Sequence, residues 1–130
     1  MSSNKDTSIF ELESSLQLTD FVNILLEPLY QYKHIYLIRL GLHEALVNAV
    51  KHGNKLDPSK IIIVKRIITP NWWVWIIQDQ GKGMENNKRK FNLPKRTDSV
   101  SGRGLFIIHE CFDDVRWSPK GNRVQLALKR

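Results

Sequence analysis

The feature of this chain that most limits its fold is the segment 71–77, which reads Asn-Trp-Trp-Val-Trp-Ile-Ile and is apolar almost throughout. A strand with one solvated face alternates polar and apolar residues, whereas a nearly continuous apolar run is typical of a strand covered on both faces. We therefore expect a strand in the centre of a sheet, with helices on one face and a partly apolar opposite face. Pro70 and Asn71 separate this run from a second run rich in Ile and Val at 60–69, which predicts a tight antiparallel hairpin.

The remaining segments alternate between helical and strand patterns. Two antiparallel hairpins among interleaved helices favour an α/β (α+β) two-layer sandwich over a doubly wound parallel sheet. Its sheet would be mixed and largely antiparallel, with the helices on one face. We expect a single domain over 1–130, with residues 1–8 frayed. The expected helices cover 19–29, ending or bending at Pro28, 33–52 and 104–112, and the further strands cover 9–16, 114–117 and 123–129.

The composition is that of an ordinary soluble globular protein, with 42% apolar and 25% charged residues. The one cysteine, Cys111, cannot form an internal disulfide, and its apolar surroundings favour a buried small hydrophobe over a reactive thiol. No secretory signal pattern is visible, and the most apolar stretch is far shorter than the roughly 18 residues of a membrane-spanning helix. We therefore expect a cytoplasmic protein with no membrane partner.

The net charge of +7 is concentrated in one segment. Between Lys82 and Arg103 there are seven basic and two acidic residues, which leaves +5 there. Residues 85–100 are polar, lack a sustained period and include Pro94, so they predict a long functional loop. A basic loop can attract phosphates or an acidic protein surface, or it can simply be solvated. We expect no nucleic-acid partner, because charge alone gives unspecific attraction and the chain has no known reader motif.

A polar column interrupts the apolar pattern of the second expected helix. Glu44, Asn48 and His52 are spaced at i, i+4 and i+8, which places a carboxylate, an amide and an imidazole on one helix face. The amide oxygen of Asn48 is a hard ligand suited to Mg²⁺, and the Glu44 carboxylate could serve as general base. Glu44 could instead pair with a lysine, and for His52 we favour a structural role as a helix-end cation.

The first of two glycine-rich segments follows the central strand. Asp79 ends that strand and precedes Gly81 and Gly83. A carboxylate there can accept a hydrogen bond from an amine such as the adenine N6 group, and the glycines let the backbone approach a flat ring closely. Taken alone, the segment is better explained as an ordinary Asp-x-Gly turn that ends a strand. It does not begin a Rossmann fingerprint, because Asn86 stands where the third glycine belongs.

The second glycine-rich segment is Gly102-Arg103-Gly104, ahead of the third expected helix. Free backbone N–H groups and the helix dipole make a helix start favourable for an anion, and glycines let phosphate oxygens come near. Taken alone, it is a plain glycine-rich helix entry, and it is not a Walker loop. Read together with the polar column and Asp79, it predicts a nucleotide site.

These motifs resemble those of the GHKL (Bergerat-type) ATPase superfamily, which includes gyrase, the mismatch-repair ATPase and sensor histidine kinases. Within it, the chain is most similar to the small stand-alone anti-sigma factor serine-protein kinases, over nearly its whole length. The resemblance implies a histidine-kinase-like ATPase fold that binds ATP and Mg²⁺. It is carried by three motifs in order, Glu44…Asn48…His52, Asp79-x-Gly81-x-Gly83 and Ser101-Gly-Arg-Gly-Leu-Phe106, and by the late segment 112–126.

The resemblance also assigns roles to individual residues. Glu44 would be the catalytic carboxylate, Asn48 would hold Mg²⁺ against the phosphates, and Asp79 would read adenine. Residues 85–100 would form the ATP lid. Many superfamily members carry a threonine on a late strand near adenine, whereas residues 123–126 read Arg-Val-Gln-Leu here. The other expected nucleotide contacts are His52, Gly81, Gly83, Met84, Gly102, Arg103, Gly104 and Leu105.

The partners implied by the resemblance are proteins. Members of the family phosphorylate a serine on a STAS-type anti-sigma factor antagonist, sequester a sigma factor and often form homodimers. We accordingly expect an ATP-dependent serine-protein kinase and anti-sigma factor in a partner-switching pathway. The alternative is a nucleotide-binding regulatory switch without kinase activity, because the same residues would bind nucleotide in either case. The strongly basic lid would favour a triphosphate or an acidic partner.

Overall fold

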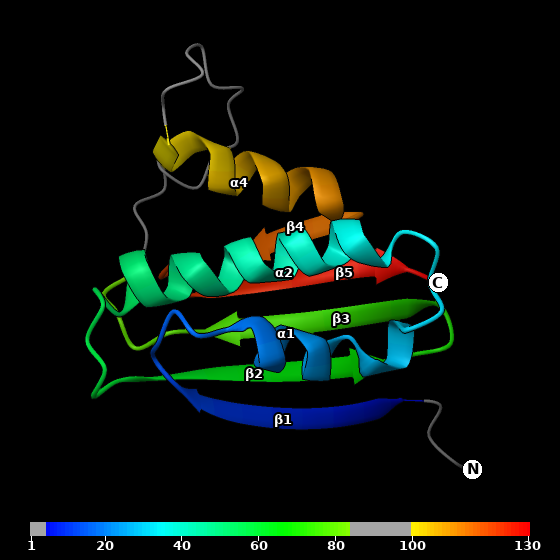
Figure 1. The fold of residues 1–130 in the computed structure, drawn as a ribbon, viewed down its shortest axis with the longest axis horizontal. Helices are drawn as coiled ribbons and strands as arrows, with labels where there is room; N and C mark the ends of the chain where they lie inside the picture. The colour runs from blue at the N-terminus through cyan, green and yellow to red at the C-terminus, as the bar shows by residue number, and fades with distance from the viewer. Residues whose placement is uncertain (1–4, 84–99) are drawn as a thin grey trace.

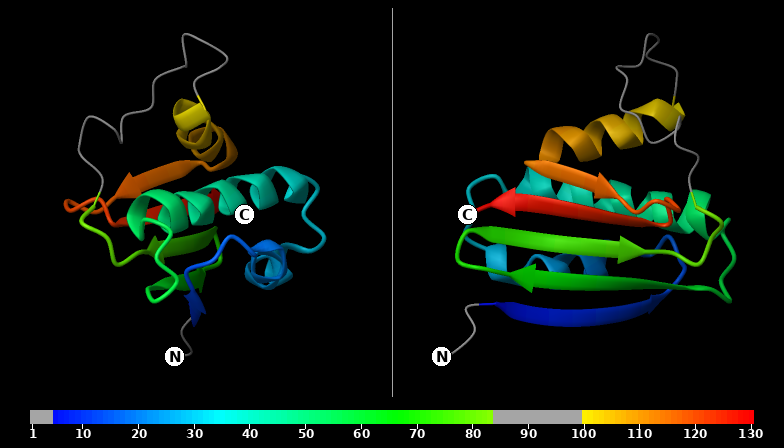
Figure 2. Two further views of the ribbon diagram at one scale, coloured as in Figure 1. Left: turned by 60° about the vertical axis from the view of Figure 1, so that its left-hand side comes forward. Right: turned by 180° about the vertical axis from the view of Figure 1, so that it is seen from behind.

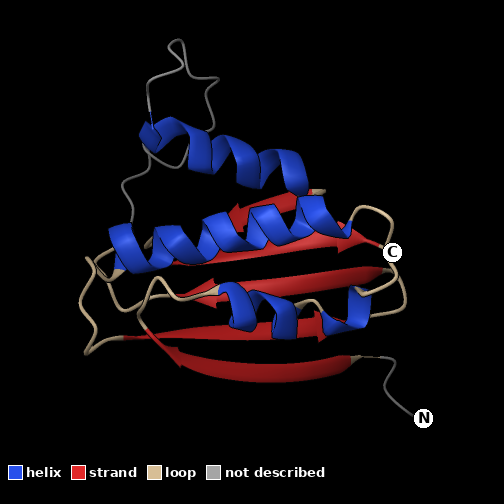
Figure 3. Ribbon diagram, in the orientation of Figure 1, coloured by secondary structure: helices blue, strands red, loops and turns tan. Residues whose placement is uncertain are grey.

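In the part of the chain that the structure describes, five strands form one sheet, and the helices pack on one of its faces (Figure 1, Figure 3). The computed structural model describes residues 5–83 and 100–130. Besides α-helices and strands, the chain has a 3₁₀ segment, η1, and a π-helical segment, η2. The order along the chain is β1 (Asp6–Glu13), α1 (Thr19–Leu25), η1 (Glu27–Leu29), α2 (Ile35–Asn48), η2 (Ala49–Gly53), β2 (Ile61–Ile68), β3 (Trp72–Gln78), α4 (Val100–Cys111), β4 (Asp114–Trp117) and β5 (Arg123–Lys129).

The strands lie in the order β1-β2-β3-β5-β4, so the apolar strand β3 is central, as predicted. Both expected antiparallel hairpins, β2–β3 and β4–β5, are confirmed. They are joined by antiparallel pairing of β3 with β5, and β1 adds antiparallel to β2. The predicted two-layer sandwich is therefore confirmed. The described strands pair only in the antiparallel sense, so their sheet lacks the parallel component of the mixed sheet that we expected.

The face of the sheet opposite the helices is open and partly apolar. The view from behind shows the strands with no described helix in front of them (Figure 2, right). On this face Ile9 of β1 is 67% exposed and Ile63 of β2 is 38% exposed. The sequence prediction of a partly apolar second face is thus confirmed. None of the helices in the described ranges is long and apolar enough to cross a membrane.

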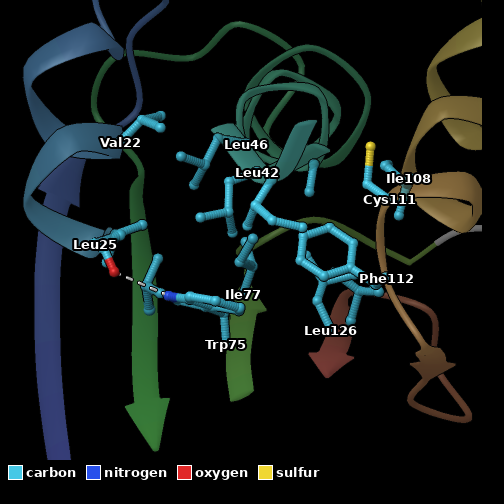
Figure 4. Packing of buried hydrophobic residues seen from close by; sticks show 14 of the residues in the cluster. Val22, Leu25, Leu42, Leu46, Trp75, Ile77, Ile108, Cys111, Phe112 and Leu126 are labelled. Atoms are coloured by element: carbon cyan, nitrogen blue, oxygen red, sulfur yellow. Dashed lines mark hydrogen bonds between the residues drawn. The ribbon is translucent and has the colours of Figure 1, made fainter. Parts of the chain in front are cut away.

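The core lies between the sheet and the helices. Trp75, on the inner face of β3, is fully buried, and its Nε1–H donates a hydrogen bond of 3.1 Å to the carbonyl oxygen of Leu25 (Figure 4). Leu42 and Leu46 of α2 are fully buried in the same cluster. Cys111 is buried as expected, and burial raises the pKa of its thiol, so it remains a neutral, apolar side chain near neutral pH.

The ends of several elements differ from the sequence prediction. Residues 6–8, which we expected to be frayed, belong to β1, because each residue of 6–13 pairs with β2. The first helix ends at Leu25, and Pro28 lies in the following 3₁₀ turn, which confirms the expected effect of proline. The second helix is α-helical only as far as Asn48.

The packing predicts unequal costs for two leucines of α2. Leu46 is 0% exposed, whereas Leu40 is 44% exposed. Leu46→Ala should lower the free energy of unfolding by about 2–5 kcal/mol, because truncation in the core loses apolar burial and leaves a cavity. Leu40→Ala should change it by less than about 1 kcal/mol. Urea denaturation followed by circular dichroism measures both values, and equal losses would contradict this assignment of the core.

Candidate functional site

Residues from the end of α2, the end of β3 and the second hairpin line one pocket. Its empty volume is about 420 Å³, part of it open to solvent. Four residues predicted from the sequence, Asn48, His52, Asp79 and Gly83, are among its walls. The pocket therefore joins the polar column to the first glycine-rich segment. Its other described walls are Ala45, Ala49, Gly53, Ile77, Trp117, Gly121, Asn122, Arg123 and Val124.

The helical side of the pocket is formed where α2 changes from an α-helix to the π-helical segment η2. Asn48 is the last α-helical residue and is half-buried. His52 lies in the last turn of η2, is exposed and also lines the pocket. π-Helical turns are rare and often lie at functional sites. His52 thus lies at the end of the helix and also forms part of the pocket wall.

Asn54 fixes this helix end to the sheet. It is 0% exposed, and both ends of its amide are paired. Its Nδ2 donates a hydrogen bond of 3.0 Å to the carbonyl oxygen of Ile61 at the start of β2. Its Oδ1 accepts a hydrogen bond of 2.7 Å from the backbone N–H of Gln80, next to Asp79. Through these two bonds the Asn54 side chain positions the loop after β3.

The Asp79 carboxylate is held at the base of the pocket and is only 9% exposed. Its Oδ1 accepts a hydrogen bond of 2.7 Å from the Gly81 backbone N–H. Its own backbone N–H donates to the carbonyl oxygen of Asn122 at 2.9 Å, which ties the loop to the second hairpin. Burial raises the pKa of the Asp79 carboxyl, and the rise is opposed by the Gly81 N–H and by the charges of Lys120 and Lys60.

Gly81 and Gly53 allow this loop to pack against the end of η2. A methyl group on Gly81 would collide with the carbonyl oxygen of Gly53, and one on Gly53 would collide with the Asp79 carboxylate. Gly81 is therefore required for close approach of two backbones, and Gly53 leaves room for the Asp79 carboxylate. The sequence predicted that Gly81 and Gly83 let the backbone approach a flat ring. In the structure, Gly81 allows close packing against Gly53 and donates its N–H to the Asp79 carboxylate.

The start of α4 lies against the polar column of α2. A methyl group on Gly104 would lie 3.3 Å from Glu44 Oε2 and 3.5 Å from Asn48 Oδ1. The second glycine-rich segment thus lies against Asn48, which also lines the pocket, and against Glu44 beside it. The first four backbone N–H groups of an α-helix have no partner within the helix, and in α4 these belong to residues 100–103. An anion held there would lie beside Asn48 and Glu44.

One prediction about this segment was wrong. We expected Gly102, Arg103 and Gly104 to precede a helix that begins at Gly104, but α4 begins at Val100 and contains all three. Two glycines within three residues lower helix propensity, which is why the sequence pattern began the helix too late. Packing of α4 against α2 overrides that propensity, and Gly104 allows the two helices to come close.

The remaining predicted contacts have different positions. Leu105 packs against the hydrophobic core and is not among the described walls of the pocket. Glu44 faces Gly104, half-buried, beside the pocket. Met84 and the lid residues 85–99 lie outside the described residues.

The second hairpin supplies pocket walls that sequence reasoning did not select. Trp117 ends β4, Asn122 precedes β5, and Arg123 begins it. The turn itself was predicted, but its place beside Asp79 depends on the pairing of β3 with β5. That pairing joins segments about 50 residues apart, for which the local pattern carries no signal.

The comparison with known proteins identifies the class. Residues 22–128 match the family described as the histidine kinase-like ATPase domain. Because this match spans most of the chain, the protein belongs to that family. The expected resemblance to the GHKL superfamily is confirmed.

The curated relatives carry two kinds of name. An anti-sigma F factor of Anoxybacillus flavithermus is 32% identical over 88 residues, which cover 65% of this chain and 60% of that protein. An anti-sigma F factor of Clostridium perfringens is 26% identical over 97 residues, with coverages of 72% and 69%. The serine-protein kinase RsbW of Bacillus licheniformis is 29% identical over 94 residues, with coverages of 67% and 59%. The matches thus span 59% to 69% of these relatives.

The raised pKa of Asp79 predicts that this residue makes the free energy of unfolding depend on pH. Because the folded state binds this proton more tightly than the unfolded state, stability falls as the pH rises through a window that begins near the ordinary carboxyl pKa of about 4. Asp79→Asn keeps an acceptor for the Gly81 N–H and cannot ionise. The variant should therefore lose less stability than the wild type between pH 4 and pH 7. Urea denaturation at both pH values tests this, and identical losses would contradict it.

Proposed function

We propose that this protein is an ATP-dependent serine-protein kinase and anti-sigma factor that phosphorylates a STAS-type anti-sigma factor antagonist. The observation that carries the proposal is the meeting of three distant segments, in which Gly104 lies against Glu44 and Asn48 while Asn48 and Asp79 line one pocket. The names of the relatives, anti-sigma F factor and serine-protein kinase, support the same activities.

Adenine is the base that suits the pocket. A buried carboxylate needs donors, and the exocyclic amine of adenine supplies one for Asp79. The Gly81 N–H uses Oδ1 of Asp79, which leaves Oδ2 to accept from the base. Apolar walls from Ile77 and Val124 complete a site for a flat ring. We infer that the base enters here and that the phosphates extend toward α4.

The phosphates would meet the first turn of α4. The backbone N–H groups of residues 100–103 and the helix dipole favour negative charge at that point. Asn48 Oδ1, close to Gly104, is the protein ligand suited to Mg²⁺, which usually keeps several waters and binds phosphate oxygens at the same time. When bound, Mg²⁺ would neutralise part of the phosphate charge.

Glu44 is the proposed catalytic residue. Its carboxylate lies one helical turn before Asn48 and faces Gly104, so it would stand beside the terminal phosphate. In that position it can orient the acceptor serine hydroxyl or accept its proton. Phosphoryl transfer depends mainly on positioning and on charge stabilisation, and both are supplied here by groups on packed helices.

The nucleotide site predicts two separable binding defects. Asp79→Asn should weaken ATP about 10–100-fold, because a hydrogen bond to a charged group contributes about 1.5–3 kcal/mol. Asn48→Ala should weaken ATP only when Mg²⁺ is present. Isothermal titration with and without Mg²⁺ measures both effects, and the exposed Asp20→Asn on α1 is the control. Unchanged affinity in Asp79→Asn would remove this carboxylate from the site.

The kinase activity predicts a defect in turnover without a defect in binding. Glu44→Gln should retain ATP affinity but transfer γ-phosphate to a STAS-type antagonist at least about 100-fold more slowly, as expected for loss of an acid–base group. The control is Glu110→Gln, an exposed glutamate on α4. Transfer of labelled phosphate is the measurement. ATP binding by the wild type without any transfer would instead favour a nucleotide-binding switch that acts through partner binding alone.

A further inference from the structure

The indole of Trp117 leaves a polar group unpaired beside the pocket. Its Nε1 is buried and has no hydrogen-bond partner among residues 5–83 and 100–130, while the side chain forms part of the pocket wall together with Asp79. The indole of Trp75 shows the contrast, because its buried Nε1–H is paired with the Leu25 carbonyl oxygen. An unpaired buried donor destabilises the folded state, and such groups in folded proteins are few. Several buried side-chain atoms lack a partner within the described ranges, but Trp117 is the residue among them that lines this pocket, so we look for its acceptor in a ligand bound there.

Strand register places this indole at the edge of an apolar floor. Trp117 of β4 is the direct partner of Val124 of β5, and Val124 is the direct partner of Ile77 of β3. Directly paired residues project from the same face of a sheet, so the three side chains form one row across three strands. Asp79 follows Ile77 by two residues at one end of the row, and Trp117 stands at the other end.

This row presents one acceptor and one donor to a flat ligand. The Asp79 carboxylate accepts hydrogen bonds, and the Trp117 indole can only donate. Adenine carries the complementary pair, an exocyclic amine and ring nitrogens that accept. A base with a carbonyl group in place of the amine would set an oxygen against the Asp79 carboxylate. The two ends of the row thus distinguish adenine from such bases.

We propose that Trp117 determines base specificity, with the edge of its ring against the edge of the adenine and its Nε1–H donating to a ring nitrogen of the base. This inference rests on the proposed ATP site and adds to it a contact from β4. The ring would contribute to affinity for purines in general. The donor would contribute only where the base offers an acceptor at the matching position.

The test separates the ring from the donor. Trp117→Phe keeps an aromatic wall and removes the N–H, and Trp73→Phe, the same substitution in β3 outside the pocket walls, is the control. By isothermal titration, Trp117→Phe should weaken ATP about 5–10-fold, as for the loss of one hydrogen bond, while the control leaves affinity unchanged. One of 1-deaza-, 3-deaza- and 7-deaza-ATP, which each lack a single ring acceptor, should bind the wild type and Trp117→Phe equally.

A second measurement uses the wild-type protein. In a ¹⁵N-labelled sample the Trp117 indole is one of four such signals, and it should move downfield when ATP is added. If that signal is unmoved and Trp117→Phe binds ATP like the wild type, the inference is overturned. In that case a loss of affinity in Asp79→Asn would leave the proposed function standing. Equal weakening of ATP and all three analogues would overturn the donor contact, and failure of the wild type to bind ATP would overturn both proposals.

Discussion

Antiparallel pairing of β3 with β5 is the contact on which the rest of the molecule depends. It joins two hairpins, each of which could form locally, into one sheet. At the end of that pairing the Asp79 N–H donates to the Asn122 carbonyl oxygen, so the loop with the carboxylate and the tip of the second hairpin are held together. The helices α2 and α4 then meet above the completed sheet (Figure 1). Without this pairing, the pocket would lack the walls that the second hairpin supplies.

The candidate site is organised before any ligand arrives. Asn54 and Gly81 hold the loop after β3 through buried hydrogen bonds and close backbone contact. This arrangement keeps the Asp79 carboxylate away from water, and burial raises the pKa of the Asp79 carboxyl. A protein that only needed to fold would have little reason to keep such a group, since a neutral side chain could pair with the same N–H. A buried acceptor held on a fixed loop has a function if the site binds a ligand that donates a hydrogen bond to it.

Local patterns predicted the elements, and long-range contacts decided how they meet. The strands 114–117 and 123–129 were predicted with correct bounds, because the turn residues at 118–122 separate two segments that alternate polar and apolar residues. The start of α4 was missed, because Gly102 and Gly104 suggest a helix boundary while packing against Glu44 and Asn48 extends the helix past them. The π-helical turn at Ala49 has no sequence signature. Trp117 was missed as a site residue because its neighbours belong to β5 and β3, far along the chain.

The positions of the four tryptophans have a practical consequence. Trp72, Trp73 and Trp75 belong to β3, away from the described pocket walls, and only Trp117 of the four is part of those walls. The intrinsic fluorescence of Trp117 should therefore change when the pocket is occupied, whereas the fluorescence of the three tryptophans of β3 reports on the sheet. In a protein with Trp72 and Trp73 replaced by phenylalanine, emission would follow ligand arrival in real time, without any attached dye.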